Sequence, residues 1–149
     1  MHDLFIIIIA GIWGTLLMTG AMYLLFLITR KNYKVVGILA TMVTNHTTRD
    51  KGLTKSRSDL FIGVVLHYLI GIIFSFIYYF LCESAVMEPD IRSGMLFGMA
   101  AGIVAMIFWY CFIKMHPNPP LIPLYSYIIV VGLGHVIFGL GLYMVFMRF

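Results

Sequence analysis

The sequence has few charged residues, since Asp, Glu, Lys and Arg make up 11% of its 149 residues while apolar residues make up 62%. A mean hydropathy of +1.00 lies outside the range of soluble domains, so the composition excludes a soluble globular protein. The apolar stretches also lack the alternating polarity of a membrane β-barrel, whose strands are segments of about 10 residues. The chain is therefore predicted to be an integral membrane protein built from helices.

Paired cysteines and membrane-embedded acids are missing too. Cys82 and Cys111 fall near opposite membrane faces, so they cannot form an internal disulfide, and no Cys-x-x-Cys or Cys-His cluster indicates a metal site. No Asp or Glu lies within an apolar run, which disfavours a proton-coupled carrier. No Ser-His-Asp or Cys-His arrangement can be assembled at one depth, so we expect no catalytic residues and a function other than catalysis.

Four apolar runs are long enough to span a bilayer, which takes about 20 residues. They cover residues 4–29, 60–81, 91–113 and 124–147. The predicted fold class is all-α, a polytopic membrane four-helix bundle that forms a single domain over residues 1–149. A shorter apolar segment at 33–44 is expected to lie at the membrane interface or to cap the bundle, and the polar segment 45–58 is expected to be mobile.

Basic residues gather between the first two spans and set the orientation. The basic residues of this loop are Arg30, Lys31, Lys34, Arg49, Lys51, Lys55 and Arg57. The loop between the second and third spans holds only Arg92, so the positive-inside rule places the first loop in the cytoplasm and both termini outside. This topology and contact with anionic lipid head groups explain the net charge of +4 without a nucleic-acid partner.

Spacing patterns recur between the two halves of the chain. The first and third spans share one pattern, Gly14, Ala21, Met22 and Arg30 against Gly98, Ala105, Met106 and Lys114. The second and fourth spans share a His-x-x-x-Gly element, at His67–Gly71 and His135–Gly139. These repeats predict two parallel helical hairpins related by an axis along the membrane normal. Such symmetry would bring His67 and His135 to similar depth on facing helices.

The two histidines are the ionisable residues at the centres of the spans. An ionisable side chain in hydrocarbon is costly, so it is interpreted as a functional site facing the protein interior. The candidate ligand-binding residues are His67, His135, Gly71, Gly139, Tyr68 and Trp109, with Trp13, Phe108 and Tyr110 as further aromatic walls. This site would bind, pass or support a small or lipophilic molecule, with no metal and no cofactor required.

Two other hypotheses stay open for the same histidines. Each imidazole could be neutral and structural, hydrogen-bonded to a carbonyl or to a hydroxyl such as that of Tyr68, Ser75 or Tyr143. Alternatively, the pair could ligate a b-type haem between the second and fourth spans of a redox subunit, with a glycine one turn from each ligand.

Glycines form stripes at helical spacing on three of the spans. Gly94, Gly98 and Gly102 make a tandem GxxxG on the third span, and Gly63 and Gly141 lie on the second and fourth. Such stripes allow helix backbones to approach closely, within one chain or between copies. A structural or assembly protein, forming a homo-oligomer or binding a membrane partner protein, is therefore a third class of function.

Four landmarks, in order along the chain, resemble a known family. They are His67-Tyr68-Leu69-Ile70-Gly71, Met87-Glu88-Pro89, Pro117-Asn118-Pro119 and the glycine-rich stretch from His135 to Tyr143. In these the chain is similar to small bacterial inner-membrane proteins of unknown function, domain-of-unknown-function family 2938, over most of its length. The resemblance implies a bacterial inner-membrane location and no assigned reaction. It also points to His67, Gly71, His135, Gly139 and Gly141 as positions to test.

Overall fold

The structure is a computed structural model that describes residues 2–148 of the chain. Within this range it contains α1 (His2–Thr29), α2 (Val35–Thr44), α3 (Arg57–Glu83), α4 (Ile91–Met115) and α5 (Leu124–Phe146). The four longer helices are long and apolar enough to cross a membrane. The predicted all-α fold with four membrane helices is thus confirmed, and every helix ends within three residues of its predicted bounds.

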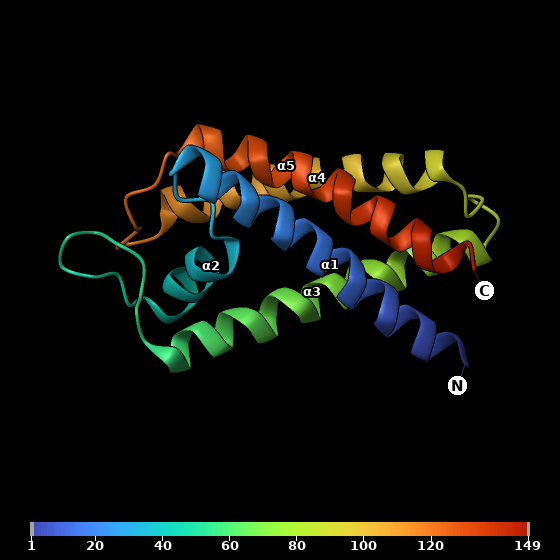
Figure 1. The fold of residues 1–149 in the computed structure, drawn as a ribbon, viewed down its shortest axis with the longest axis horizontal. Coiled ribbons are helices and arrows are strands. Elements are labelled where there is room, and N and C mark those ends of the chain that lie inside the picture. Colours follow the sequence, from blue (N-terminus) through green and yellow to red (C-terminus); the bar gives the residue numbers. More distant parts are fainter. Residues whose placement is uncertain (1, 149) are drawn as a thin grey trace.

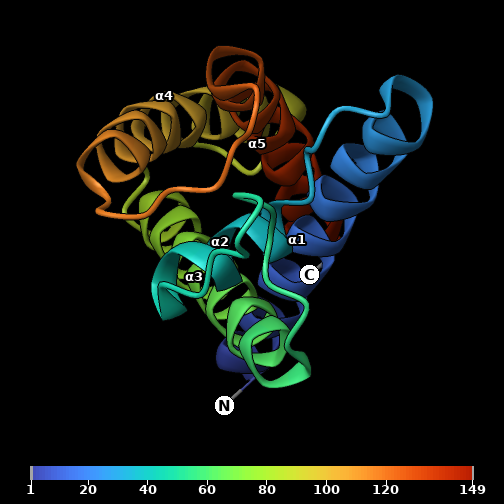
Figure 2. The same ribbon diagram turned by 90° about the vertical axis from the view of Figure 1, so that its left-hand side faces the viewer.

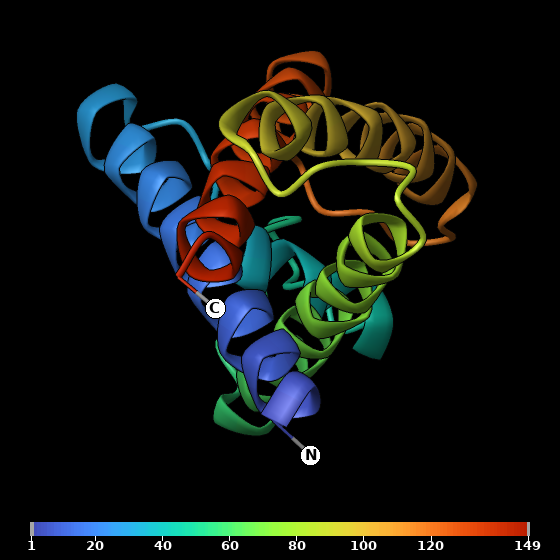
Figure 3. The same ribbon diagram turned by 90° about the vertical axis from the view of Figure 1, so that its right-hand side faces the viewer.

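The four long helices pack as two pairs. Helix α1 packs against α3, α4 lies along α5, and α1 also contacts α5, so that α1 and α5 join the pairs (Figure 1). We call the end of the bundle that carries α2 and the connections 45–56 and 116–123 the basic end. The opposite end carries both termini and the α3–α4 turn (Figure 3), and we call it the acidic end because Glu83 ends α3 and Glu88 and Asp90 belong to the turn.

Glycines sit where these helices touch. The stripe Gly94, Gly98 and Gly102 of α4 faces the backbone of α5, and a Cβ at Gly102 would lie 2.7 Å from the carbonyl oxygen of Gly132. On α5, Gly141 meets the backbone of Gly14 in α1. Gly63 of α3 packs on α2 instead. The glycine stripes therefore serve contacts inside one chain, which leaves the α4 stripe covered by α5.

At the acidic end, α3 and α4 are held together by a buried hydrogen bond. Ser93 directs its own hydroxyl proton to the carbonyl of Asp90 at 2.9 Å, so the Tyr78 hydroxyl donates to Ser93 Oγ, also at 2.9 Å. Ser93 and Asp90 in addition form the capping box that starts α4. This bond fixes where the two helices meet, and from there they diverge toward the basic end (Figure 2).

We expect Tyr78→Phe to lower the free energy of unfolding by about 1 kcal/mol, because it removes this one buried hydrogen bond and keeps the ring. The neighbouring Tyr79→Phe is the matched control, since the Tyr79 hydroxyl lies beside Glu83 of its own helix, so its loss breaks no hydrogen bond between α3 and α4. Thermal unfolding of both variants in detergent, followed by circular dichroism, measures the difference. Equal stability of the two variants would contradict the role given to the Tyr78–Ser93 bond.

Helix α2 caps the bundle instead of lying flat at its surface. Most of its residues are buried, and it packs mainly against α3, with a smaller contact to α1. His116, just after α4, accepts from the backbone N–H of Asn118 through Nδ1 at 3.1 Å and donates from Nε2 to the carbonyl of Met42 at 2.8 Å. Of the two placements that the sequence allows for this segment, the structure therefore has the cap.

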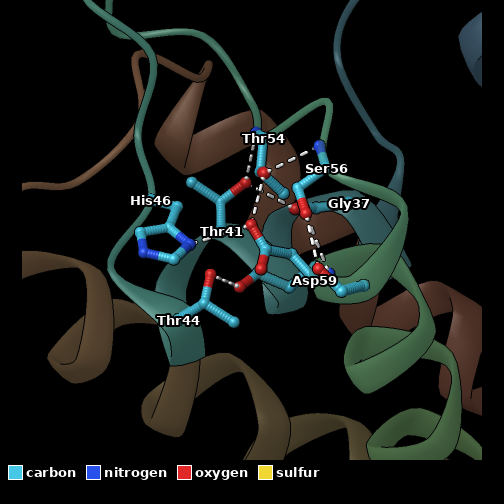
Figure 4. A network of polar contacts seen from close by, with 9 residues as sticks. Gly37, Thr41, Thr44, His46, Thr54, Ser56 and Asp59 are labelled. Atoms are coloured by element: carbon cyan, nitrogen blue, oxygen red, sulfur yellow. Dashed lines mark hydrogen bonds and ion pairs between the residues drawn. The ribbon is translucent and has the colours of Figure 1, made fainter.

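The polar connection between α2 and α3 is tied down at several points, which differs from the mobile segment expected. The Lys51 carbonyl accepts from the Leu121 N–H at 2.7 Å, and the Lys51 ammonium donates to Asn118 Oδ1 at 2.6 Å, so the two connections of the basic end are joined. The buried Asp59 carboxylate accepts from Thr54 at 2.7 Å and lies 3.0 Å from His46 Nδ1 (Figure 4). An exposed hydrogen bond from Thr48 lowers the pKa of Asp50.

Candidate functional site

His67 of α3 and His135 of α5 line the same cavity, which has a volume of about 300 Å³. His67 follows the start of α3 at Arg57 by ten residues and His135 follows the start of α5 at Leu124 by eleven, so both lie about 15 Å along their helices from the basic end. Gly71 and Trp109 line the cavity as well. Phe108, predicted as an aromatic wall, lines the cavity too, so sequence reasoning named five residues that the structure brings together in one place.

The imidazole of His67 contacts α1. Its Nε2 lies 3.0 Å from the hydroxyl oxygen of Thr19, and its ring meets the edge of the Tyr68 ring at a centroid distance of 6.2 Å. One turn further along α3, Gly71 leaves room for the Thr15 side chain and the α1 backbone, so that α3 lies close against α1 at this level. His67 is half-buried between this seam and the cavity.

The imidazole of His135 is held by its own helix. Its Nδ1 lies 2.8 Å from the carbonyl oxygen of Val131, one turn earlier, so Nδ1 carries the proton and donates it. The ring packs against Phe74 of α3 at a centroid distance of 6.2 Å. None of Tyr68, Ser75 or Tyr143 forms a hydrogen bond to either histidine within residues 2–148, and Ser75 instead donates to the carbonyl of Ile7.

Aromatic and aliphatic side chains make up most of the cavity wall. Phe74 and Phe138 pack against each other at 6.4 Å on the acidic side of the histidines and close the cavity there. Val35 and Leu39 of α2, both buried, close it toward the basic end. The remaining lining residues are Thr15, Met18, Ile70, Val104, Ala105, Phe108 and Trp109. The site is therefore an apolar chamber with two imidazoles as its main polar groups.

The cavity opens to the side, between α3 and α4. Three of its lining residues are also exposed on the outer surface of the bundle, Ile70 of α3 at 42% and Val104 and Phe108 of α4 at 58% and 53%. Ile70 thus belongs to α3 and Val104 and Phe108 to α4, the two helices that diverge toward the basic end (Figure 2). In a membrane this surface faces acyl chains, so the opening gives access from the lipid.

Some predicted site residues lie elsewhere. Gly139 faces the backbone of Gly94 and Gly98 and serves helix packing, and Tyr68 touches the His67 ring without lining the cavity. Trp13 and Tyr110 are exposed at 39% and 42% on the outer surface, so their assignment to the cavity wall was wrong.

Sequence reasoning also missed residues that the cavity does contain. Phe74 lies two turns after His67, and Phe138 lies three residues after His135. Residues at these spacings share a helix face, so helical spacing from each histidine could have predicted both aromatic rings as part of the site. Thr19, which contacts His67, lies on a different helix, so spacing along α3 could not predict it.

The chemistry of the cavity is that of a neutral binding site. Among residues 2–148, no Asp, Glu, Lys or Arg lines it, and no group of three metal-ligating side chains is found in that range. A charged ligand would thus lack a counter-ion in a medium where unpaired charge is costly. The two histidines can give or accept hydrogen bonds, and the aromatic walls can bury an apolar body.

A family model described as a family of unknown function, DUF6789, matches residues 1–149. The chain belongs to this family. The resemblance inferred from the sequence was right in that the family has no known function, but the family number was not the one expected. No curated protein and no solved structure matches the chain.

This DUF6789 chain has a second, smaller crevice beside the first cavity, with a volume of about 210 Å³. It lies between α1, the start of α2 and the start of α3, and is lined by Tyr23, Tyr33 and Lys34 among others. Val35 lines both spaces, and Thr19, which lines the crevice, is the residue that contacts His67. The Thr19–His67 pair therefore stands between the crevice and the cavity.

Proposed function

We propose that this DUF6789 protein is a multi-pass protein of the bacterial inner membrane that binds a small lipophilic molecule, and passes or supports it, without catalysis. The observation that carries the proposal is the cavity of about 300 Å³ that two imidazoles share and that opens toward the lipid between α3 and α4. Its volume lies at the lower end of ligand pockets, which are mostly apolar with a few convergent polar groups. A ligand dissolved in the bilayer reaches it without crossing the basic end.

The proposed orientation places the basic end in the cytoplasm and both termini outside. Eight of the ten Lys and Arg residues belong to the basic end, whereas Arg92 and Arg148 belong to the acidic end. This asymmetry follows the positive-inside rule. The cavity then lies in the cytoplasmic half of the bilayer, with α2 between it and the cytoplasm.

The test is to identify what the protein retains when it is purified from bacterial membranes in a mild detergent. We expect mass spectrometry to detect a lipophilic molecule with the unaltered protein, and the double variant His67→Ala, His135→Ala to lose it. His46→Ala is the matched control, because His46 lies at the basic end, outside the cavity. Circular dichroism and size-exclusion chromatography check that each variant keeps its helices.

Two results would count against the proposal. If the double variant retains the same molecule in the same amount as the His46→Ala control, the cavity is not where the molecule binds. If the reduced protein shows a sharp visible absorption band that both histidine substitutions abolish, a bis-histidine haem occupies the site, and the redox alternative replaces the binding function.

A further inference from the structure

The hydrogen-bond pattern of the two histidines carries information about the ligand, and the inference drawn from it rests on the proposed function. His135 donates through Nδ1 to the Val131 carbonyl at 2.8 Å. A neutral imidazole has one N–H and one bare nitrogen, so Nε2 of His135 is an acceptor. Neutrality follows from the setting, since among residues 2–148 no carboxylate lines the cavity to balance an imidazolium.

The tautomer of His67 can be inferred from the hydrogen bonds of the threonines in the helices. Five threonines lie in the helices, and four of them, Thr15, Thr29, Thr41 and Thr44, donate their hydroxyl proton to the backbone carbonyl four residues earlier. Thr19 forms no such bond within the described part of the chain, and its hydroxyl instead lies 3.0 Å from His67 Nε2. Its proton is therefore available to the imidazole.

A hydrogen bond donated by Thr19 to His67 Nε2 determines whether the other ring nitrogen, Nδ1, carries a proton. Nε2 is then the acceptor, so the proton of the neutral imidazole lies on Nδ1, which has no protein partner within residues 2–148. The two histidines that line the cavity thus keep one donor, Nδ1–H of His67, and one acceptor, Nε2 of His135, without a protein partner within residues 2–148. A donor and an acceptor on different helices match a ligand group that both accepts and donates.

We infer that the ligand is a neutral lipophile whose polar end is a hydroxyl group, as in a lipophilic alcohol or phenol. The hydroxyl oxygen accepts from His67 Nδ1–H, and the hydroxyl proton goes to His135 Nε2. A carboxylic acid fits less well, because it is ionised near neutral pH and no cation lines the cavity within residues 2–148. Phe74, Phe108, Trp109 and Phe138 in the wall favour a ring next to the hydroxyl.

Trp109 provides a direct reporter of this binding. The protein has two tryptophans, so Trp13→Phe leaves Trp109, which lines the cavity, as the single one. Trp13 faces outward at 39% exposure and is not part of the site. Three matched probes carry a bromine at the end of the same alkyl chain and quench tryptophan on contact. They are para-(bromohexyl)phenol, its methyl ether and bromohexylbenzene, compared at equal mole fraction in lipid nanodiscs.

The three probes differ only in their hydrogen bonds. The phenol donates and accepts, the ether only accepts, and bromohexylbenzene does neither. We expect the phenol to quench Trp109 at a mole fraction about tenfold lower than the ether, the effect of one well-placed hydrogen bond. His135→Ala should bring the phenol to the level of the ether. His67→Ala should weaken the phenol and the ether together and leave bromohexylbenzene unchanged.

Controls separate this inference from the function it rests on. His46→Ala should keep the order of the three probes, and Thr19→Val should reduce the advantage of the ether over bromohexylbenzene with both histidines in place. If a histidine variant loses its helices, Thr19→Val is used in its place to test the inference. Equal quenching by phenol and ether in the unaltered site overturns the hydroxyl ligand and leaves the binding function standing. Failure of all three probes to quench Trp109, with no molecule co-purifying, overturns both.

Discussion

Gly98→Ala is expected to destabilise the protein by about 2 kcal/mol or more, the cost of forcing extra volume into a close-packed contact. An alanine Cβ at this position would meet the carbonyl oxygen of His135, and it would lie 2.9 Å from Val136 Cα. Both atoms belong to the backbone of α5, which cannot turn aside as a side chain can. The strain would separate α4 from α5 at the level of His135, so ligand binding should fall as well.

Gly20→Ala is the matched control on α1, because a Cβ there meets no atom within 4 Å. Replacing glycine by alanine at such an open helical position stabilises a helix slightly. Thermal unfolding of both variants in the same detergent gives the comparison. If Gly98→Ala and Gly20→Ala unfold at the same temperature, α4 and α5 do not pack as described.

The same contacts bear on whether the glycines build an assembly. Gly94, Gly98 and Gly102 all face α5 of their own chain, so this stripe is not free to join a second copy. An assembly role, if the protein has one, falls to other surfaces. Gly98→Leu should therefore unfold the chain, whereas the assembly hypothesis expects it to dissociate intact subunits.

Hydrophobic patterning was sufficient to predict the helices. Helices α1, α3 and α4 extend slightly beyond their apolar runs, whereas α5 ends one residue before the end of its run. For example, α3 begins at Arg57 because Ser56 accepts a hydrogen bond from the Asp59 N–H, and its charged first turn falls outside a hydropathy window. At the other limit, α4 ends at Met115 because Pro117 disfavours a helical conformation at His116.

The shape of the site was less accessible to sequence reasoning. The repeat predicts that α3 and α4 meet in the way that α1 and α5 do. In the structure α1 and α5 pack closely through Gly14 and Gly141, whereas α3 and α4 meet at the acidic end and diverge from there. Local spacing identifies which residues share a face but does not set which helices separate. The cavity lies between α3 and α4, where the packing of the helices departs from the symmetry of the sequence repeat.

The position of α2, which closes the cavity toward the basic end, could not be predicted for a related reason. A ten-residue apolar helix such as α2 can lie on the membrane surface or pack inside the protein, and its composition is the same in both cases. Its position here depends on distant partners, such as His116, which donates to the Met42 carbonyl. Sequence reasoning gave His116 no role for the same reason.

Ala105→Phe is expected to abolish ligand binding and to leave the fold intact. Ala105 lines the cavity on α4, one turn before Trp109, so a phenyl group at this position projects into the space of about 300 Å³ that the ligand would use. The added ring fills an existing void and buries more apolar surface, so the free energy of unfolding should stay the same or rise. This distinguishes the variant from a glycine substitution, which loses binding because it disturbs the fold.

Ile103→Phe provides the control, since Ile103 lies on the same helix but is 53% exposed on the outer surface. Both variants add one aromatic ring to α4, and only one of them enters the cavity. Quenching of Trp109 by para-(bromohexyl)phenol and mass spectrometry of co-purifying molecules, each with a thermal unfolding curve, measure the two effects. A stable Ala105→Phe protein that still binds the probe as tightly as Ile103→Phe would show that the ligand binds outside the cavity. Loss of binding in Ala105→Phe alone would place the ligand in the space between α3 and α4, because Ile103→Phe adds the same ring to α4 outside that space.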